Sequence, residues 1–333
     1  MTTQFTRRQT LVAGAGLAAA AFMPRFAQAA NTTWQMATAY TDGNFHTKNI
    51  VTFLSDLKTA TDGRLDVRLH SNASLLPMPQ IKRGVQQGQV QLGEILLSAY
   101  GNEDPFFEVD GIPQLVTTFA EAKRLADLAR PYIEARFQRQ GVSLLYMVPW
   151  PPSGFYTPNP IATIEDLRGT RMRTYNTMTN RFATAVGAAP TLVQAAEVAQ
   201  AFATGIVNAM VTSAATGVDT QAWDYVKVYT PIGFTFTRNA VFVQRRALEA
   251  LSPADQAAVR ATAATAEARG WAAAEAARAS TQAVLASHGM TVSEPTPELL
   301  AGMAQVSRGV TDEWLTRSGE DGAKLIAAYR AGA

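Results

Sequence analysis

The side chains best suited to bind an anion lie in the segment Asp166–Asn180. Gly169 is expected to end a short helix, and a strand is expected over Arg171–Tyr175. The next helix would begin near Thr177 or Thr179, either of which can cap its N-terminus. Arginine offers a planar fork to a carboxylate, and a helix N-terminus favours negative charge. Arg173, Tyr175 and Asn176 therefore form a candidate carboxylate site. A structural ion pair of the arginine is the alternative.

A second group of side chains is expected at the rim of a parallel sheet. The pattern of residues 34–94 is β-α-β-α-β, and ligands of open α/β sheets bind outside the carboxyl ends of the strands. The short strand 90–93 would place Glu94 at its carboxyl end. No second histidine lies nearby in sequence, so His46 is not expected to bind a metal. The candidate ligand contacts here are Tyr40, Asn44, Phe45, His46 and Glu94.

Aromatic and hydroxyl side chains accompany two further points of the chain. Trp150 and Phe155 flank the proline cluster at 149–152, which is stiff and suits a crossing between two domains. Thr212 and Ser213 end an expected strand, and the alternation of residues 229–236 predicts another strand. Packing between domains is the alternative role for the aromatic residues. The candidate ligand contacts in this set are Trp150, Phe155, Thr212, Ser213, Trp223 and Phe234.

The segment L-R-G-T-R-M-R, followed by G-A-A-P and then G-I-V-N-A-M, resembles the centre of the periplasmic solute-binding proteins of TRAP transporters (the DctP type). V-Q-x-G-x-x-x-x-G-E, which ends at Glu94, and the loop G-N-F-H-T extend the resemblance over most of the chain. The resemblance implies that Arg173 grips the carboxylate of an organic acid, whereas Arg171 faces solvent. It further implies delivery of that acid to a membrane permease.

Two departures from the family pattern concern the ligand. No second arginine lies near Ser153, and Thr212-Ser213 replaces the usual Q-E-N-P. These departures favour a monocarboxylate with an aromatic or otherwise apolar body, such as an aryl or indolyl acid, over a diacid or a sugar acid.

The resemblance implies an α/β fold with two lobes, crossing hinge strands and a long helix. Lobe I is expected to comprise residues 31–150 and 238–278, and lobe II residues 151–237 and 279–333. Ser252-Pro253 begins an alanine-rich helix that continues to about His288, unless Gly270 divides it. A helix of that length spans about 50 Å, so it must cross both lobes.

The N-terminal segment 1–29 is expected to be an export signal of the twin-arginine type. Arg7 and Arg8 precede an apolar run, and Ala27-Gln28-Ala29 suits cleavage. Removing this segment leaves 26 basic residues against 27 acidic ones, so no basic surface argues for nucleic acid. We therefore expect a periplasmic location.

An exported enzyme is the rival class. The chain has no cysteine and only three histidines, and it lacks G-x-S-x-G, H-E-x-x-H, P-loop and G-x-G-x-x-G motifs. We therefore expect no catalytic residue, metal or cofactor. A receptor for a sensor or for another type of transporter cannot be separated from a TRAP receptor by sequence. Lobes that must open and close favour a monomer.

Overall fold

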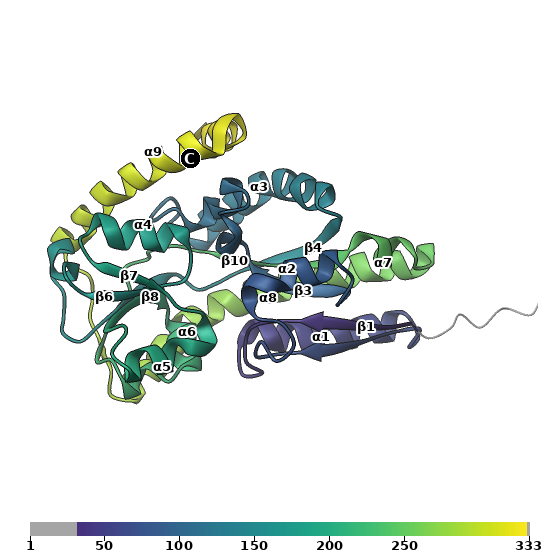
Figure 1. Cartoon of the computed structure of the whole chain (residues 1–333), viewed down its shortest axis with the longest axis horizontal. Helices are drawn as coiled ribbons and strands as arrows, with labels where there is room; N and C mark the ends of the chain where they lie inside the picture. The colour runs from purple at the N-terminus through teal and green to yellow at the C-terminus, as the bar shows by residue number, and fades with distance from the viewer. Residues whose placement is uncertain (1–31, 332–333) are drawn as a thin grey trace, which may run out of the picture. The chain divides into compact units, whose positions relative to one another are not determined.

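The described residues, 32–331 of a computed structural model, are built on two mixed β-sheets with helices packed against each (Figure 1). The first sheet has the order β2-β1-β3-β10-β4. β1 pairs in parallel with β2 and β3, and β10 runs antiparallel to β3 and β4. Its strands are β1 (Thr32–Ala37), β2 (Leu65–His70), β3 (Leu92–Leu96), β4 (Val142–Pro149) and β10 (Arg238–Gln244). Its helices are α1 (Phe45–Ala60), α2 (Met78–Gln86), α3 (Phe119–Arg139) and α7 (Arg245–Glu249).

The second sheet has the order β11-β9-β5-β8-β6-β7. β6 pairs in parallel with β7 and β8, whereas β5 is antiparallel to β8 and β9. Its strands are β5 (Ser153–Thr157), β6 (Arg171–Thr174), β7 (Ala189–Leu192), β8 (Ala209–Ser213), β9 (Val228–Thr230) and β11 (Thr291–Val292). Its helices are α4 (Thr177–Ala185), α5 (Val198–Ala203) and α6 (Ala214–Asp219).

Two chain segments cross between the sheets side by side. The first leads from β4 to β5 through the proline cluster, and the second returns from β9 to β10. The backbone N–H of Trp150 donates to the Thr237 carbonyl at 2.8 Å, and that of Phe234 donates to the Ser153 carbonyl at 2.8 Å. These crossing strands confirm the predicted fold of two α/β halves joined at a hinge, which we call the first and second halves after their sheets.

Helix α8 (Pro253–Ser287) is a third connection, and it packs against α1 and β4 of the first half and α6 of the second (Figure 1). The helix continues unbroken through Gly270, as expected, and the alternative of a division there does not hold. A Cβ at Gly270 would come within 2.3 Å of a Val148 methyl group and 2.9 Å of the Asn49 amide. The glycine therefore allows close packing of α8 on β4 and does not end the helix.

Helix α9 (Pro297–Ala331) contacts α3 and α4, so it also touches both halves (Figure 1). It is kinked at Gly319, whose φ of 63° and ψ of −148° are non-helical. The assignment of residues 31–150 with 238–278, and of 151–237 with 279–333, to two lobes stays a prediction.

Three local expectations were wrong. Glu94 lies in the middle of β3 and not at its end, because the strand begins later and continues to Leu96. The strand expected over 229–236 stops at Thr230, and Gly233 then takes a left-handed φ of 65°. Helix α4 is capped by Asn176, whose side-chain oxygen accepts from the Thr179 N–H at 2.8 Å, and not by Thr177 or Thr179.

No helix within residues 32–331 is both long enough and apolar enough to cross a membrane. The signal predicted for residues 1–29 lies outside the described residues.

Candidate functional site

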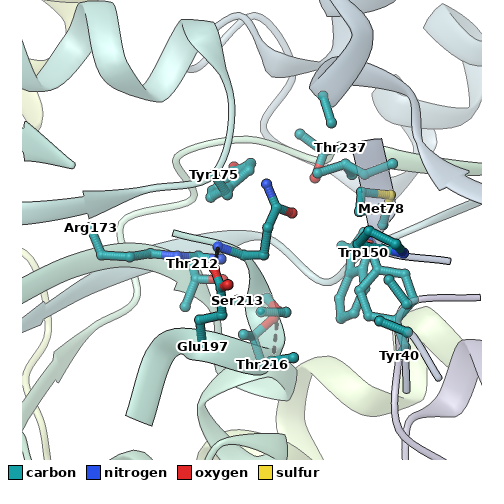
Figure 2. A pocket seen from close by; sticks show the side chains of 18 of the residues that line it. Tyr40, Met78, Trp150, Arg173, Tyr175, Glu197, Thr212, Ser213, Thr216 and Thr237 are labelled. Atoms are coloured by element: carbon teal, nitrogen blue, oxygen red, sulfur yellow. Dashed lines mark hydrogen bonds between the residues drawn. The ribbon is translucent and has the colours of Figure 1, made fainter. Parts of the chain in front are cut away.

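A cavity of about 130 Å³ lies between the two halves of the molecule. Figure 2 shows its lining as two groups of side chains that face each other. The aromatic wall consists of Tyr40, Met78 and Trp150 from the first half and its hinge segment. The arginine wall consists of Arg173, Tyr175, Thr212 and Ser213 from the second half. Six of these seven residues are among the ligand contacts predicted from the sequence, and Met78 is the exception.

Arg173 is positioned by β6, which lies between β8 and the edge strand β7 of the second sheet, and the residue is 3% exposed. Its Nε donates to the Val193 carbonyl at 2.9 Å, which orients the guanidinium along the end of β7. No carboxylate among residues 32–331 lies within ion-pair distance of it, so the predicted alternative of a structural ion pair is absent from the described part. Burial lowers the pKa of Arg173 to about 10, and the group stays charged at neutral pH.

The rest of the arginine wall is polar and fixed by the protein. The Tyr175 ring lies 5.3 Å from the Arg173 guanidinium carbon, and its hydroxyl is 3.2 Å from that of Thr235. Thr212 and Ser213 end β8, and the Ser213 hydroxyl accepts from the Thr216 N–H at 3.2 Å. This wall therefore presents a buried cation beside hydroxyl groups.

The aromatic wall is a stack of rings at the hinge. The centroids of Tyr40 and Trp150 are 5.0 Å apart, and those of His46 and Trp150 are 4.5 Å apart. Phe45 meets the Trp150 ring edge-on at 5.4 Å from behind. Burial lowers the pKa of His46 to about 3, so its ring is neutral and packs as part of the stack.

Glu94 lies behind the aromatic wall and does not line the cavity. Its carboxylate accepts from the Thr38 hydroxyl at 2.5 Å and from the Asn239 amide at 2.9 Å, and His46 Nδ1 is 3.5 Å away. Burial raises the pKa of Glu94 to about 7, against the opposing effect of these hydrogen bonds.

Two of the predicted contacts connect the halves outside the cavity. The Asn44 amide donates to Asp219 Oδ2 at 2.5 Å, and the Asn176 amide donates to the Ser98 hydroxyl at 2.8 Å. A second cavity of about 270 Å³ shares Tyr40 and Trp150 with the first and extends to Asp219. The bond between Asn44 and Asp219 therefore lies beside an extension of the site.

Three predicted aromatic contacts lie elsewhere. Phe155 and Phe234 pack with Phe182, with the Phe182 and Phe234 centroids 4.8 Å apart. Trp223 stacks on His288 at 3.9 Å. Neither group lines the cavity, and packing, the alternative considered for aromatic residues, describes their surroundings.

The sequence reasoning missed several lining residues. Gln194 and Glu197 follow β7, a short strand that was not anticipated, although the carboxyl end of a parallel strand is where a contact would be sought. Ser153 and Thr237 lie on the paired hinge segments, and Met78 begins α2. Their positions depend on how the two crossings pair, which the local sequence does not show.

A group of three or more His, Cys, Asp or Glu side chains suited to a metal ion is not found among residues 32–331. The arrangement is that of a binding site: a fixed guanidinium faces a wall of rings across a small cavity.

Comparison with known proteins agrees with this reading. The chain matches the family model for bacterial extracellular solute-binding proteins, family 7 (DctP), over residues 36–317. Among solved structures it is similar to two extracytoplasmic solute receptors of Bordetella pertussis that bind pyroglutamic acid. DctP7 is 43% identical and DctP6 40%, each with a TM-score of 0.89 over 90% of this chain and 99% or more of the receptor.

A third similar structure is a marine metagenome TRAP solute-binding protein specific for pyroglutamate. It is 31% identical, with a TM-score of 0.88, and the match covers 91% of this chain and 99% of that protein. The family and these proteins are binding receptors and not enzymes. On this evidence the chain belongs to family 7 of the bacterial extracellular solute-binding proteins, the DctP-type receptors of TRAP transporters.

Proposed function

We propose that this protein is a periplasmic receptor that captures a small cyclic monocarboxylate of the pyroglutamate class and delivers it to a TRAP membrane permease. The observation that carries the proposal is that Arg173 lines the cavity, is buried and has no ion-pair partner among the described residues. Three similar receptors, 31–43% identical over at least 90% of this chain, bind pyroglutamate. That similarity supports the choice of ligand class.

The carboxylate would bind to the Arg173 guanidinium. Nε is already used by the Val193 carbonyl, which leaves the two terminal nitrogens of the fork for a ligand. In Figure 2 the side chain extends from the arginine wall toward the aromatic wall. A buried guanidinium without an ion-pair partner among the described residues is costly, and a bound carboxylate would offset that cost with two charge-assisted hydrogen bonds.

The body of the ligand would lie against the aromatic wall. The cavity beside Arg173 encloses about 130 Å³, which suits a small ring, and the adjoining cavity of about 270 Å³ brings the site to the lower end of the ~300–1,000 Å³ of pockets that hold drug-sized ligands. Trp150, Tyr40 and Met78 supply apolar surface for the carbons of a small ring. The side chains of Thr212, Ser213 and Gln194 supply polar groups for a ring amide.

An aryl or indolyl acid, favoured by the aromatic residues in the sequence, is the second candidate. Trp150 and Tyr40 still support an apolar body. Phe155, Trp223 and Phe234 do not contribute to the lining. Fewer aromatic rings therefore face the ligand than the sequence suggested, which favours a smaller ring.

The remaining parts of the proposal concern location and assembly. Arg7, Arg8 and the Ala27-Gln28-Ala29 site support twin-arginine export to the periplasm. We propose a monomer, because an obligate dimer gripping both halves would oppose closure. A light-scattering mass of twice the chain would contradict this.

Calorimetry with four compounds tests the ligand. L-pyroglutamate is expected to bind, whereas 2-pyrrolidone, the same ring without the carboxylate, should bind at least about a hundredfold more weakly. Cyclopentanecarboxylate keeps the acid and removes the ring amide, so it measures the contribution of the polar groups. Indole-3-acetate tests the aryl alternative. Tighter binding of indole-3-acetate than of pyroglutamate would replace the proposal with that alternative, and equal binding of 2-pyrrolidone would overturn the role of Arg173.

A further inference from the structure

Glu94 is a buried carboxylate for which ligand capture supplies no direct task. Its side chain is 1% exposed, and it lies in the middle of β3, behind the cavity. A carboxylate removed from water is costly, so a buried one calls for an explanation. Both of its oxygens are occupied by protein groups, Oε2 by the Thr38 hydroxyl and Oε1 by the Asn239 amide.

Asn239 connects Glu94 to the aromatic wall. Trp150 Nε1 donates to Asn239 Oδ1 at 2.8 Å, and the Tyr40 hydroxyl donates to the same oxygen at 3.4 Å. An indole N–H can only donate, so the Asn239 atom that faces Trp150 must be the oxygen. The amide nitrogen then points to Glu94, which accepts its hydrogen at 2.9 Å.

We infer that Glu94 is a positioning residue for the ligand cavity. By accepting from the Asn239 amide it fixes which way that amide faces, and the amide in turn fixes the rings of Trp150 and Tyr40. Glu94 therefore acts on ligand affinity without contacting the ligand. The inference deepens the proposed function. The part of its test that measures affinity for pyroglutamate rests on that proposed function.

The hydrogen bond matters because ring packing alone does not set the position of the wall. Trp150 contacts Tyr40, His46 and Phe45 at centroid distances of 4.5 to 5.4 Å, and such contacts tolerate small slides and tilts. The bond to Asn239 is directional. If the amide turned over, its NH₂ group would face the Trp150 N–H, and two donors in contact would displace the indole.

Two substitutions of the same residue separate the hydrogen bond from the charge. Glu94→Gln keeps an oxygen that can accept from Asn239, and its amide can donate to the Thr38 hydroxyl. Glu94→Leu keeps similar bulk and removes both acceptors. We expect the Leu variant to bind pyroglutamate at least about tenfold more weakly, and the Gln variant to stay within about threefold of wild type.

Tryptophan emission gives a readout that does not depend on the ligand. Subtracting the spectrum of the matching Trp150→Phe variant in each background isolates the emission of Trp150. We expect Glu94→Leu to shift this emission and Glu94→Gln to leave it at the wild-type wavelength. If wild type fails to bind pyroglutamate, the proposed function fails, and the emission still decides the role of Glu94.

A matched control is Glu108→Leu, because Glu108 is a buried carboxylate paired with Arg317 and does not line the cavity. It should lower the melting temperature without changing the Trp150 emission. If Glu94→Leu does not fold, Asn239→Leu breaks the same link from its other end and should show the same losses. Wild-type affinity and emission in Glu94→Leu, or equal losses in Glu94→Gln and Glu94→Leu, would overturn the inference.

Discussion

The two walls of the cavity treat their buried charged groups in opposite ways. Arg173 of the arginine wall has one donor bound to a backbone carbonyl, and no ion-pair partner among the described residues. Glu94, behind the aromatic wall, has both oxygens bound to protein side chains. A buried group with unused capacity is available to a ligand, whereas a satisfied one can only build structure. The difference supports the proposal that the first wall recognises the ligand and that the second fixes the shape of the cavity.

The largest effect should come from the arginine wall. Removing one partner of a buried, hydrogen-bonded charge pair costs about 2–5 kcal/mol, so Arg173→Ala should raise the Kd for pyroglutamate about 30-fold to several thousandfold. Arg173→Lys should also weaken binding, because an ammonium cannot present a planar fork. Calorimetry measures both variants.

Arg171→Ala is the control for that experiment. Arg171 precedes Arg173 by two positions on β6, is exposed and donates to the Gly205 carbonyl. It should bind like wild type. If Arg171→Ala loses affinity for pyroglutamate and Arg173→Ala does not, the role proposed for the arginine wall is wrong.

Glu94, the carboxylate behind the aromatic wall, should make the free energy of unfolding depend on pH. Burial raises the pKa of Glu94 from 4.5 to about 7. Between these values the unfolded chain releases the proton while the folded protein keeps it, so stability falls as pH rises from 4.5 to 7. The loss is roughly 3 kcal/mol, since one pKa unit corresponds to about 1.4 kcal/mol.

Glu94→Gln removes this contribution. Urea unfolding at pH 4.5 and 7.5 should therefore show a larger loss in wild type than in the variant. Other buried acids titrate in both proteins and cancel in the difference. Identical pH dependence in the two proteins would show that Glu94 titrates in the folded protein as it does in the unfolded chain.

The support of the aromatic wall can be tested at the long helix. Gly270 packs on Val148, two residues before Trp150, and a Cβ there would lie 2.3 Å from a Val148 methyl. Overpacking costs about 1–3 kcal/mol, against about 1 kcal/mol gained from the helix propensity of alanine. Gly270→Ala should therefore lower the free energy of unfolding by up to about 2 kcal/mol.

Gly309→Ala in α9 is the matched control, because no atom lies within 4 Å of the added Cβ. It should raise stability by up to about 1 kcal/mol. Equal gains in both variants would show that α8 has room to move away from β4.

The smallest effect is expected from Trp150→Phe. The ring remains, but the donor to Asn239 is lost, and a net hydrogen bond contributes about 1 kcal/mol, or roughly fivefold in Kd. Combined with Glu94→Leu, this change should add less than its single effect, because both break one linked set of bonds. If the effects of the two substitutions on Kd are fully additive, Trp150 and Glu94 act on ligand binding independently.

The sequence predicted the elements and several of the residues that line the cavity better than the packing around them. The strand with Arg173, the Ser252 cap of α8 and the β-α-β-α-β run follow from local patterns, and the hinge follows from the proline cluster. Thr212 and Ser213 were found because a strand end can be read from the chain. The family resemblance supplied the two-lobed fold and the proposed role of Arg173.

The contacts that depend on long-range pairing could not be predicted. Asn239 touches Glu94 and Trp150 only because β10 lies between β3 and β4. Phe155 and Phe234 looked equivalent to Trp150 by residue type, but their side chains pack with Phe182. Residue type indicates what a side chain can do, and sheet order decides where it lies.

The bonds from Asn44 to Asp219 and from Asn176 to Ser98 join protein groups alone, so an unloaded receptor can form them as well as a loaded one. They stabilise the arrangement of the two halves described here whether or not a ligand is inside. This makes capture easier, because less of the ligand's binding energy goes into closure. It also sets a limit on their number: a receptor that shut too readily on nothing would compete with its own loaded copies for the docking face of the permease.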